Sequence, residues 1–106
     1  MFKFLKSLFG GNNNHAEILD AIKNGAQIID VRTRQEFQRG HIEGSTNIPV
    51  SEIGSKIQEI KRWKKPVVTV CQSGNRSRMA QKMLEQKGVT AMNGGGWYGL
   101  KNLLSR

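Results

Sequence analysis

Residues 67–84 read VVTVCQSGNRSRMAQKML, and this stretch decides the fold. Residues 67–70 form a continuous apolar and threonine run, which is typical of a central strand that is covered on both faces. A polar loop containing a glycine follows the run. From about Ser77 the sequence predicts a helix whose inward face carries Ala80 and Leu84. The stretch therefore predicts a strand, a tight loop and a helix in direct succession.

Outward from this stretch, the chain alternates between helical and strand patterns. Asn14 and Glu17 have the spacing of a capping pair at the start of a helix, and Thr33 and Glu36 repeat it. Short β-branched runs that end at turn residues predict strands. The expected helices cover residues 14–25, 33–40, 51–63, 77–88 and 97–104, and the expected strands cover residues 27–31, 45–49, 66–70 and 89–92, with a glycine turn at 94–96.

This alternation predicts a three-layer α/β domain with a central, mostly parallel sheet and helices on both faces. In such sheets the ligand site lies at the carboxyl ends of the strands. Asp30 and Arg32 lie at the end of one predicted strand, and Cys71 lies at the end of another. We therefore expect these three side chains to lie near one another.

The length of 106 residues is sufficient for one domain, which we place at residues 14–106. Residues 1–13 differ in composition and predict a basic amphipathic extension. We expect this extension to be loosely ordered or to dock on the domain. The less favoured alternative is weak attachment of residues 1–9 to a membrane surface or to a partner, which would stabilise a helix that is too short to be stable alone in water.

The chain contains one cysteine and two widely separated histidines, His15 and His41. It therefore has no intrachain disulfide and no metal-ligand spacing, and no cofactor is predicted. A lone thiol fits a reducing compartment, so we expect a cytoplasmic protein. The net charge of +9 would attract small anions. Nucleic acid is not an expected partner, because the sequence contains no module for reading bases. The cluster of Lys61, Arg62, Lys64 and Lys65 predicts a solvated helix end.

The loop after Cys71 has the composition of an anion site. Gly74 allows the backbone to turn its N–H groups inward, and these groups would meet the positive end of the following helix. Such a site would lower the pKa of Cys71 and hold a negative charge that develops on its sulfur. Arg76 would add a charge or hold the loop from outside. The structural alternative is a cysteine that merely ends a buried strand. The position of Cys71 between a strand and a helix favours instead a functional thiolate, which would face both solvent and the N–H groups.

Three motifs in order resemble the rhodanese-like sulfurtransferases: IIDVRTRQEFQRGHIEGSTNIP at residues 28–49, VVTVCQSGNRS at residues 67–77 and GGGWYGL at residues 94–100. The resemblance implies that Cys71 takes a sulfur from an anionic donor, such as thiosulfate or a persulfide, and becomes a persulfide. It then passes that sulfur to cyanide or to a low-molecular-weight or protein thiol, without a cofactor. Asp30 is implied to organise the loop through hydrogen bonds, and Arg32 to be structural or weakly substrate-facing. The implied residues that bind the substrate or persulfide are Gln72, Ser73, Gly74, Asn75, Arg76 and Ser77.

Two alternatives remain. The domain is either an enzyme or a persulfide relay that docks on a partner and turns over poorly alone. Gln72 and Ser73 are neutral, which argues against thiosulfate as the physiological donor. A phosphatase is disfavoured because those enzymes use Cys-x5-Arg, whereas Cys71 and Arg76 have the spacing Cys-x4-Arg, which suits a single sulfur. His41 is expected to tie loops together rather than to act as an acid or base.

Overall fold

The computed structural model describes residues 14–106, in which helices alternate with strands. The extension predicted over residues 1–13 lies outside this described part. Asn14 caps α2, because its side chain accepts a hydrogen bond from the Glu17 N–H at 2.8 Å. The helices are α2 (His15–Lys23), α3 (Arg34–Gln38), α4 (Ile53–Arg62), α5 (Asn75–Gln86) and α6 (Trp97–Leu104), with a short 3-10 helix η1 (Val50–Glu52). The strands are β1 (Gln27–Asp30), β2 (Thr46–Asn47), β3 (Val67–Cys71) and β4 (Ala91–Gly96).

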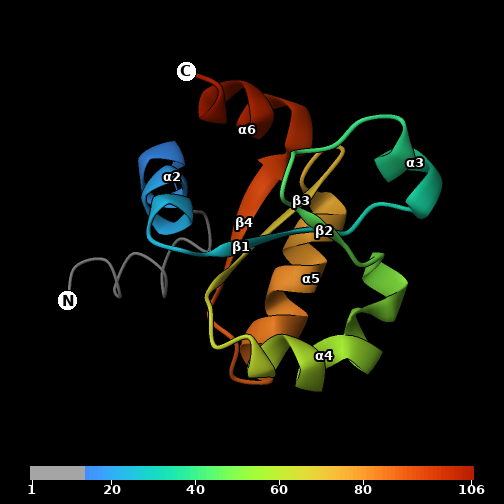
Figure 1. Cartoon of the computed structure of the whole chain (residues 1–106). Helices are drawn as coiled ribbons and strands as arrows, with labels where there is room; N and C mark the ends of the chain where they lie inside the picture. Colours follow the sequence, from blue (N-terminus) through green and yellow to red (C-terminus); the bar gives the residue numbers. More distant parts are fainter. Residues whose placement is uncertain (1–13) are drawn as a thin grey trace.

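The four strands form one parallel sheet in the order β2-β1-β3-β4 (Figure 1). Every residue of β3 is buried, as expected for a strand in the middle of a sheet that is covered on both faces. Asp30 of β1 pairs with Val70 of β3, so the carboxyl ends of these two strands lie side by side. The predicted parallel sheet is confirmed.

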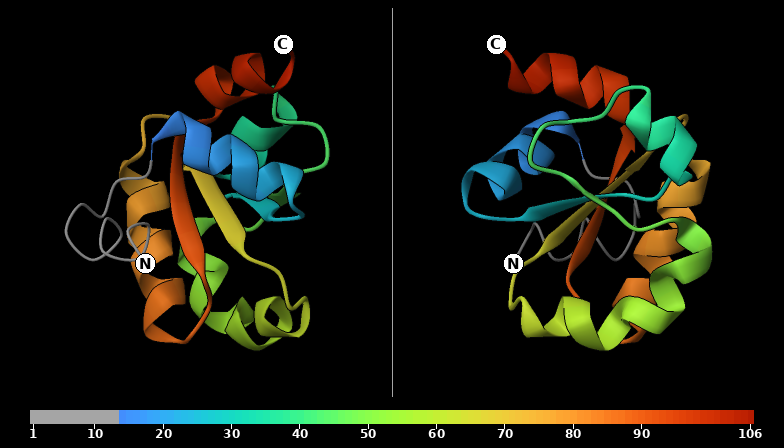
Figure 2. Two further views of the ribbon diagram at one scale, coloured as in Figure 1. Left: turned by 90° about the vertical axis from the view of Figure 1, so that its left-hand side faces the viewer. Right: turned by 45° about the vertical axis from the view of Figure 1, so that its right-hand side comes forward.

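Helices cover both faces of this sheet (Figure 2). Successive residues of a strand point to opposite faces, and β3 divides accordingly. Val67 and Cys71 belong to the core that β3 shares with α4 and α5, whereas Val68 and Val70 belong to the core that it shares with α2 and α6. The predicted three-layer arrangement is therefore also confirmed.

Helix α5 begins at Asn75, two residues earlier than the sequence predicts. Gly74 precedes it with a φ of 102°, in the left-handed region that favours glycine. Because this single residue makes the turn, the chain passes from strand to helix with little loop between them. Arg76 and Ser77 consequently lie in the first turn of α5.

The glycine run at residues 94–96 belongs to β4 and is not the turn that the sequence predicts. The pairing of β4 with β3 shifts register between Thr69 and Val70, opposite Gly94. A Cβ on Gly94 would lie 2.8 Å from Cγ1 of Val68 and 2.9 Å from Cγ1 of Val70. Glycine is used here because the two strands approach too closely for a side chain.

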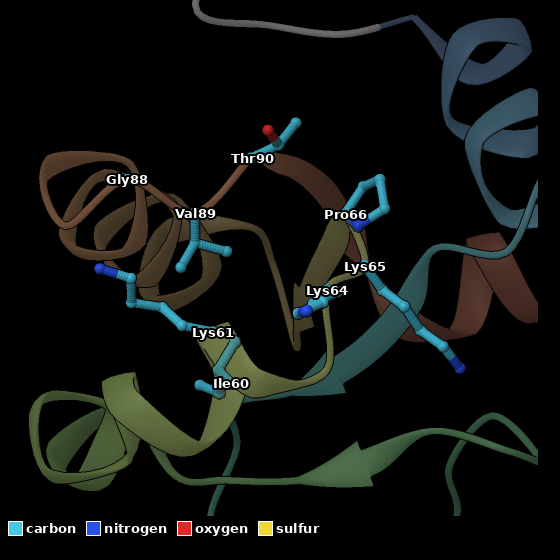
Figure 3. Close-up of a pocket in the computed structure, with 8 residues that line it drawn as sticks. All are labelled: Ile60, Lys61, Lys64, Lys65, Pro66, Gly88, Val89 and Thr90. Carbon is cyan, nitrogen blue, oxygen red and sulfur yellow. The ribbon is translucent and has the colours of Figure 1, made fainter.

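A basic pocket of about 290 Å³ lies at the opposite end of β3 from Cys71 (Figure 3). Lys61, Lys64 and Lys65 line it, together with residues 88–90, which follow α5. The Lys65 side chain points away from the pocket (Figure 3). These lysines follow or end α4, where positive charges interact favourably with the negative end of the helix dipole. Part of the positive charge is thus located far from the cysteine.

Within residues 14–106, no helix is long and apolar enough to cross a membrane. The same residues contain no group of three or more His, Cys, Asp or Glu side chains placed to hold a metal ion.

Candidate active site

Cys71 is the last residue of β3, and its sulfur lies where the chain turns into α5. The Gly74 N–H donates a hydrogen bond to Sγ over 2.9 Å, and the Ser77 hydroxyl oxygen lies 3.3 Å from Sγ. We call these groups, with the N–H groups of Ser73 and Ser77, the sulfur cradle. Cys71 is only 1% exposed. The sulfur is therefore enclosed by the loop, and the expectation that it faces solvent is wrong.

The sulfur cradle favours the ionised form of Cys71. Burial raises the pKa of the thiol, because a charge is less stable away from water. Hydrogen bonds outweigh this effect and lower the pKa overall: the Ser77 hydroxyl contributes most, followed by the N–H groups of Ser77, Gly74 and Ser73. The thiolate is the nucleophilic form of cysteine. The local geometry therefore suits a reactive sulfur.

The remaining loop residues border the outer surface of the sulfur cradle. Gly74 and Ser77 are buried with Cys71, whereas the residues around them are open to solvent. The Gln72 side chain accepts a hydrogen bond from Nε1 of Trp97 at 3.3 Å, which links the loop to the start of α6. The exposed residues are Gln72 and Ser73 of the loop and Asn75 at the start of α5.

Arg76 points out of the sulfur cradle, toward α3. Its guanidinium donates hydrogen bonds of 2.7 and 3.0 Å to the Glu36 carboxylate. Glu36 also completes the capping box at the start of α3 with Thr33. Arg76 therefore holds the loop from outside by joining α5 to α3, and its positive charge interacts with Cys71 only through space.

The Arg76–Glu36 pair leads to a prediction for acid stability. Hydrogen bonds from Arg76 and from the Thr33 N–H lower the pKa of Glu36 from its ordinary value of 4.5 to about 2. A carboxyl group whose pKa falls on folding stabilises the fold above its unfolded pKa, and this contribution is lost as the pH falls through the folded pKa. We expect Glu36→Gln to have a lower urea midpoint at neutral pH and to lose less stability than the parent chain between pH 4.5 and 2.

Urea titrations across that pH range would measure this effect. Glu43→Gln is the matched control, because Glu43 is exposed and has no ion pair within the described part of the chain. Parallel pH curves for Glu36→Gln and the parent chain would contradict the assignment.

Asp30 and Arg32 form a buried ion pair beside the carboxyl end of β3. The Arg32 guanidinium donates to the Asp30 carboxylate at 2.7 and 2.9 Å and to the Gly40 carbonyl at 2.7 Å. It also lies 4.4 Å from the ring centroid of Trp97. The Asp30 carboxylate makes its hydrogen bonds in the described structure to Arg32 alone. It therefore anchors the segment after β1 and not the Cys71 loop, and Arg32, 2% exposed, does not face a substrate.

Trp97 and His41 also belong to this framework. Trp97 packs against Gly40, where an added Cβ would lie 3.0 Å from the indole. Nδ1 of His41 lies 2.8 Å from the Phe37 carbonyl oxygen, and the two rings stack with centroids 3.8 Å apart. Trp97 therefore joins the start of α6 to the loop after α3, whereas both contacts of His41 are with Phe37, four residues earlier, and do not confirm the expectation that His41 ties two loops together. Tyr98 is 61% exposed.

Asn93 of β4 contacts the sulfur cradle and has no place in the sequence prediction. Its Oδ1 accepts hydrogen bonds from the Ser77 hydroxyl at 2.6 Å and from the Gly95 N–H at 2.9 Å. Its Nδ2 donates to the Gly74 carbonyl at 3.2 Å. The only sequence signal was an amide residue directly before a glycine run, which by itself indicates a turn.

Together these groups can ionise one thiol and hold a negative charge on its sulfur. The N–H donors and the positive end of α5 converge on a single atom, which is the arrangement required for nucleophilic catalysis by a thiolate. The loop between β3 and α5 contains only residues 72–74, so the space that it encloses is small.

Comparison with known proteins places this geometry in a family. Residues 14–102 match the model of the Rhodanese-like domain. The chain is 46% identical over 65 residues to the uncharacterized protein YqhL of Bacillus subtilis; this match covers 61% of this chain and 51% of YqhL, so the chain spans about half the length of that relative. It is 34% identical over 76 residues to the thiosulfate sulfurtransferase PspE of Escherichia coli, with 71% of each chain covered.

Solved structures give the same result. The human single-domain sulfurtransferase TSTD1 superposes with a TM-score of 0.69 and 31% identity, over 90% of this chain and 96% of that one. The fold, the order of the motifs and the match over residues 14–102 agree. The chain belongs to the rhodanese-like domain family.

Proposed function

We propose that this protein transfers a sulfane sulfur from an anionic donor to a nucleophilic acceptor through a persulfide on Cys71. The observation that carries the proposal is the sulfur cradle, with the Gly74 N–H at 2.9 Å and the Ser77 hydroxyl at 3.3 Å from Sγ. The same donors that favour a thiolate would favour the negative terminal sulfur of a persulfide. The name of the Escherichia coli relative, a thiosulfate sulfurtransferase, supports the same class of reaction.

The reaction has two balanced halves. The Cys71 thiolate attacks the outer sulfur of thiosulfate, a sulfur–sulfur bond forms on the cysteine, and sulfite leaves with the electrons of the broken bond. An acceptor then attacks the terminal sulfur and restores the thiolate. Cyanide would leave as thiocyanate, and a thiolate acceptor would leave as a persulfide.

The residues that surround the loop influence which sulfur donor and acceptor the protein can use. Gln72 and Ser73 are neutral and exposed, so they add no charge for thiosulfate at the surface of the loop. The second candidate function is therefore a persulfide relay, in which Cys71 takes sulfur from a persulfide donor and passes it to a protein or low-molecular-weight thiol. A lone free thiol at Cys71 fits reducing conditions, which is why we propose a cytoplasmic location.

Phosphatase activity is less well supported. Three residues separate β3 from α5, and Arg76 is bound to Glu36 rather than turned toward the sulfur. A phosphoryl group needs donors for several oxygens, and here the N–H groups of the sulfur cradle converge on Sγ itself.

The test is to incubate the reduced full chain with thiosulfate, remove the excess and record the intact mass. We expect the gain of one sulfur atom, its loss on addition of cyanide, and the release of thiocyanate. Sulfur gained from a low-molecular-weight persulfide but not from thiosulfate would select the relay. If neither donor loads the protein, the proposed function is wrong.

A further inference from the structure

The hydroxyl of Ser77 lies between two acceptors but carries one proton. Its oxygen is 2.6 Å from Oδ1 of Asn93 and 3.3 Å from Sγ of Cys71. While Cys71 is a thiol, the S–H can donate to the Ser77 oxygen, and the Ser77 hydroxyl can donate to Asn93. A thiolate has no proton to donate and can only accept. The Ser77 hydroxyl can then bond to the sulfur only by rotating away from Asn93.

The orientation of the Asn93 amide is fixed by its neighbours. The Gly95 N–H can only donate, so the atom 2.9 Å from it is the amide oxygen. The Gly74 carbonyl can only accept, so the atom 3.2 Å from it is the amide nitrogen. When Ser77 turns away, Oδ1 keeps the bond from Gly95 and is not left as an unpaired acceptor. The rotation therefore costs the single bond between Ser77 and Asn93 and leaves no acceptor unpaired.

We propose that Asn93 is a positioning residue that controls the direction of the Ser77 hydroxyl, holding its proton while Cys71 is a thiol and releasing it to the sulfur when Cys71 becomes a thiolate. Asn93 thus competes with the sulfur for one proton, and the ease of ionisation of Cys71 depends on both residues together. This inference rests on the proposed use of Cys71 as a thiolate.

Asn93 is neutral, so its replacement changes no charge near the sulfur. The charged groups around the sulfur cradle come from elements other than β4, the strand that carries Asn93. Helix α5 contributes Arg76, which is paired with Glu36 of α3. The buried Asp30–Arg32 pair lies at the carboxyl end of β1, and Lys101 of α6 lies over the Trp97 ring.

A double-mutant cycle separates control of the hydroxyl from simple anchoring of the loop. Cys71 is the only cysteine, so the ultraviolet absorbance of the thiolate and the pH dependence of alkylation report its pKa directly. The Asn93→Ala change is made with Ser77 intact and in a Ser77→Ala background. Loss of the bond to Gly74 affects both backgrounds alike, whereas competition for the proton exists only with Ser77.

We expect Asn93→Ala to change the pKa of Cys71 differently in the two backgrounds. The shift with Ser77 intact should lie about 0.5 to 1 unit lower than the shift in the Ser77→Ala background, which is the scale of one hydrogen bond. Asn93→Leu, which has nearly the same shape as asparagine, repeats the cycle if the alanine variant unfolds. Asn102→Ala, at an exposed site on α6, is the control and should shift nothing.

Equal shifts in the two backgrounds would show that Asn93 only anchors the loop, and a coupling of opposite sign would also overturn the proposal. The readout does not require sulfur transfer. A chain that shows the coupling but gains no sulfur would refute the proposed function and leave this inference standing. A chain that gains sulfur but shows no coupling would refute the role of Asn93 and leave the proposed function standing.

Discussion

We expect Cys71→Ser to lose sulfur transfer by a factor of about 10³ or more, because the nucleophile itself is removed. The sulfur cradle stabilises a thiolate through the Ser77 hydroxyl and three N–H groups. A serine hydroxyl ionises at far higher pH than a thiol, and these donors cannot close that gap. The variant should neither gain sulfur in the intact mass nor form thiocyanate from thiosulfate and cyanide.

The control for this variant is its fold. Serine is close to cysteine in size, and the groups that bond to Sγ can bond to a hydroxyl, so the urea midpoint should stay near that of the parent chain. A folded Cys71→Ser protein that still forms thiocyanate would show that the sulfur passes through another group. That result would contradict the role of Cys71 and the mechanism proposed for it.

Much of the fold could be predicted because its signals are local. Asn14 and Thr33 cap their helices as their spacing predicts, and the apolar run at residues 67–70 forms the buried strand β3. The sequence predicts a turn at glycines 94–96 because glycine is rare in strands. They extend β4 because of where Val68 and Val70 lie on the neighbouring strand. No local pattern contains that information.

The same division holds at the candidate site. The strand, the glycine and the helix that form the sulfur cradle lie within 18 residues, and their order in the sequence is sufficient to predict that backbone N–H groups converge near Cys71. The partners that orient it lie elsewhere. Glu36 is 40 residues from Arg76, and Asn93 is 16 residues from Ser77. Contacts of this kind depend on the packing of whole elements, so the sequence alone left Arg76 with two possible roles and Asn93 with none.

The second large effect concerns stability. We expect Asp30→Ala to lower the free energy of unfolding by about 3 to 5 kcal/mol, the usual cost of removing one partner from a buried ion pair. Arg32 would remain 2% exposed with only the carbonyls of Glu36 and Gly40 to accept its hydrogen bonds. Since a small domain is stable by about 5 to 15 kcal/mol, this is a large fraction of the total. Urea unfolding followed by circular dichroism would measure it.

Two further variants show whether the cost arises from the stranded charge. Glu52→Ala breaks the exposed pair with Arg34, whose side chain is 63% exposed, and should leave the urea midpoint nearly unchanged. The double variant Asp30→Leu with Arg32→Met replaces the buried pair by apolar side chains, and it should recover much of the stability that Asp30→Ala loses. If the double variant is less stable than Asp30→Ala, the contacts of Arg32 with Gly40 and Trp97 stabilise the fold by more than the unpaired charge destabilises it. That result would contradict the attribution of the Asp30→Ala loss to a stranded charge.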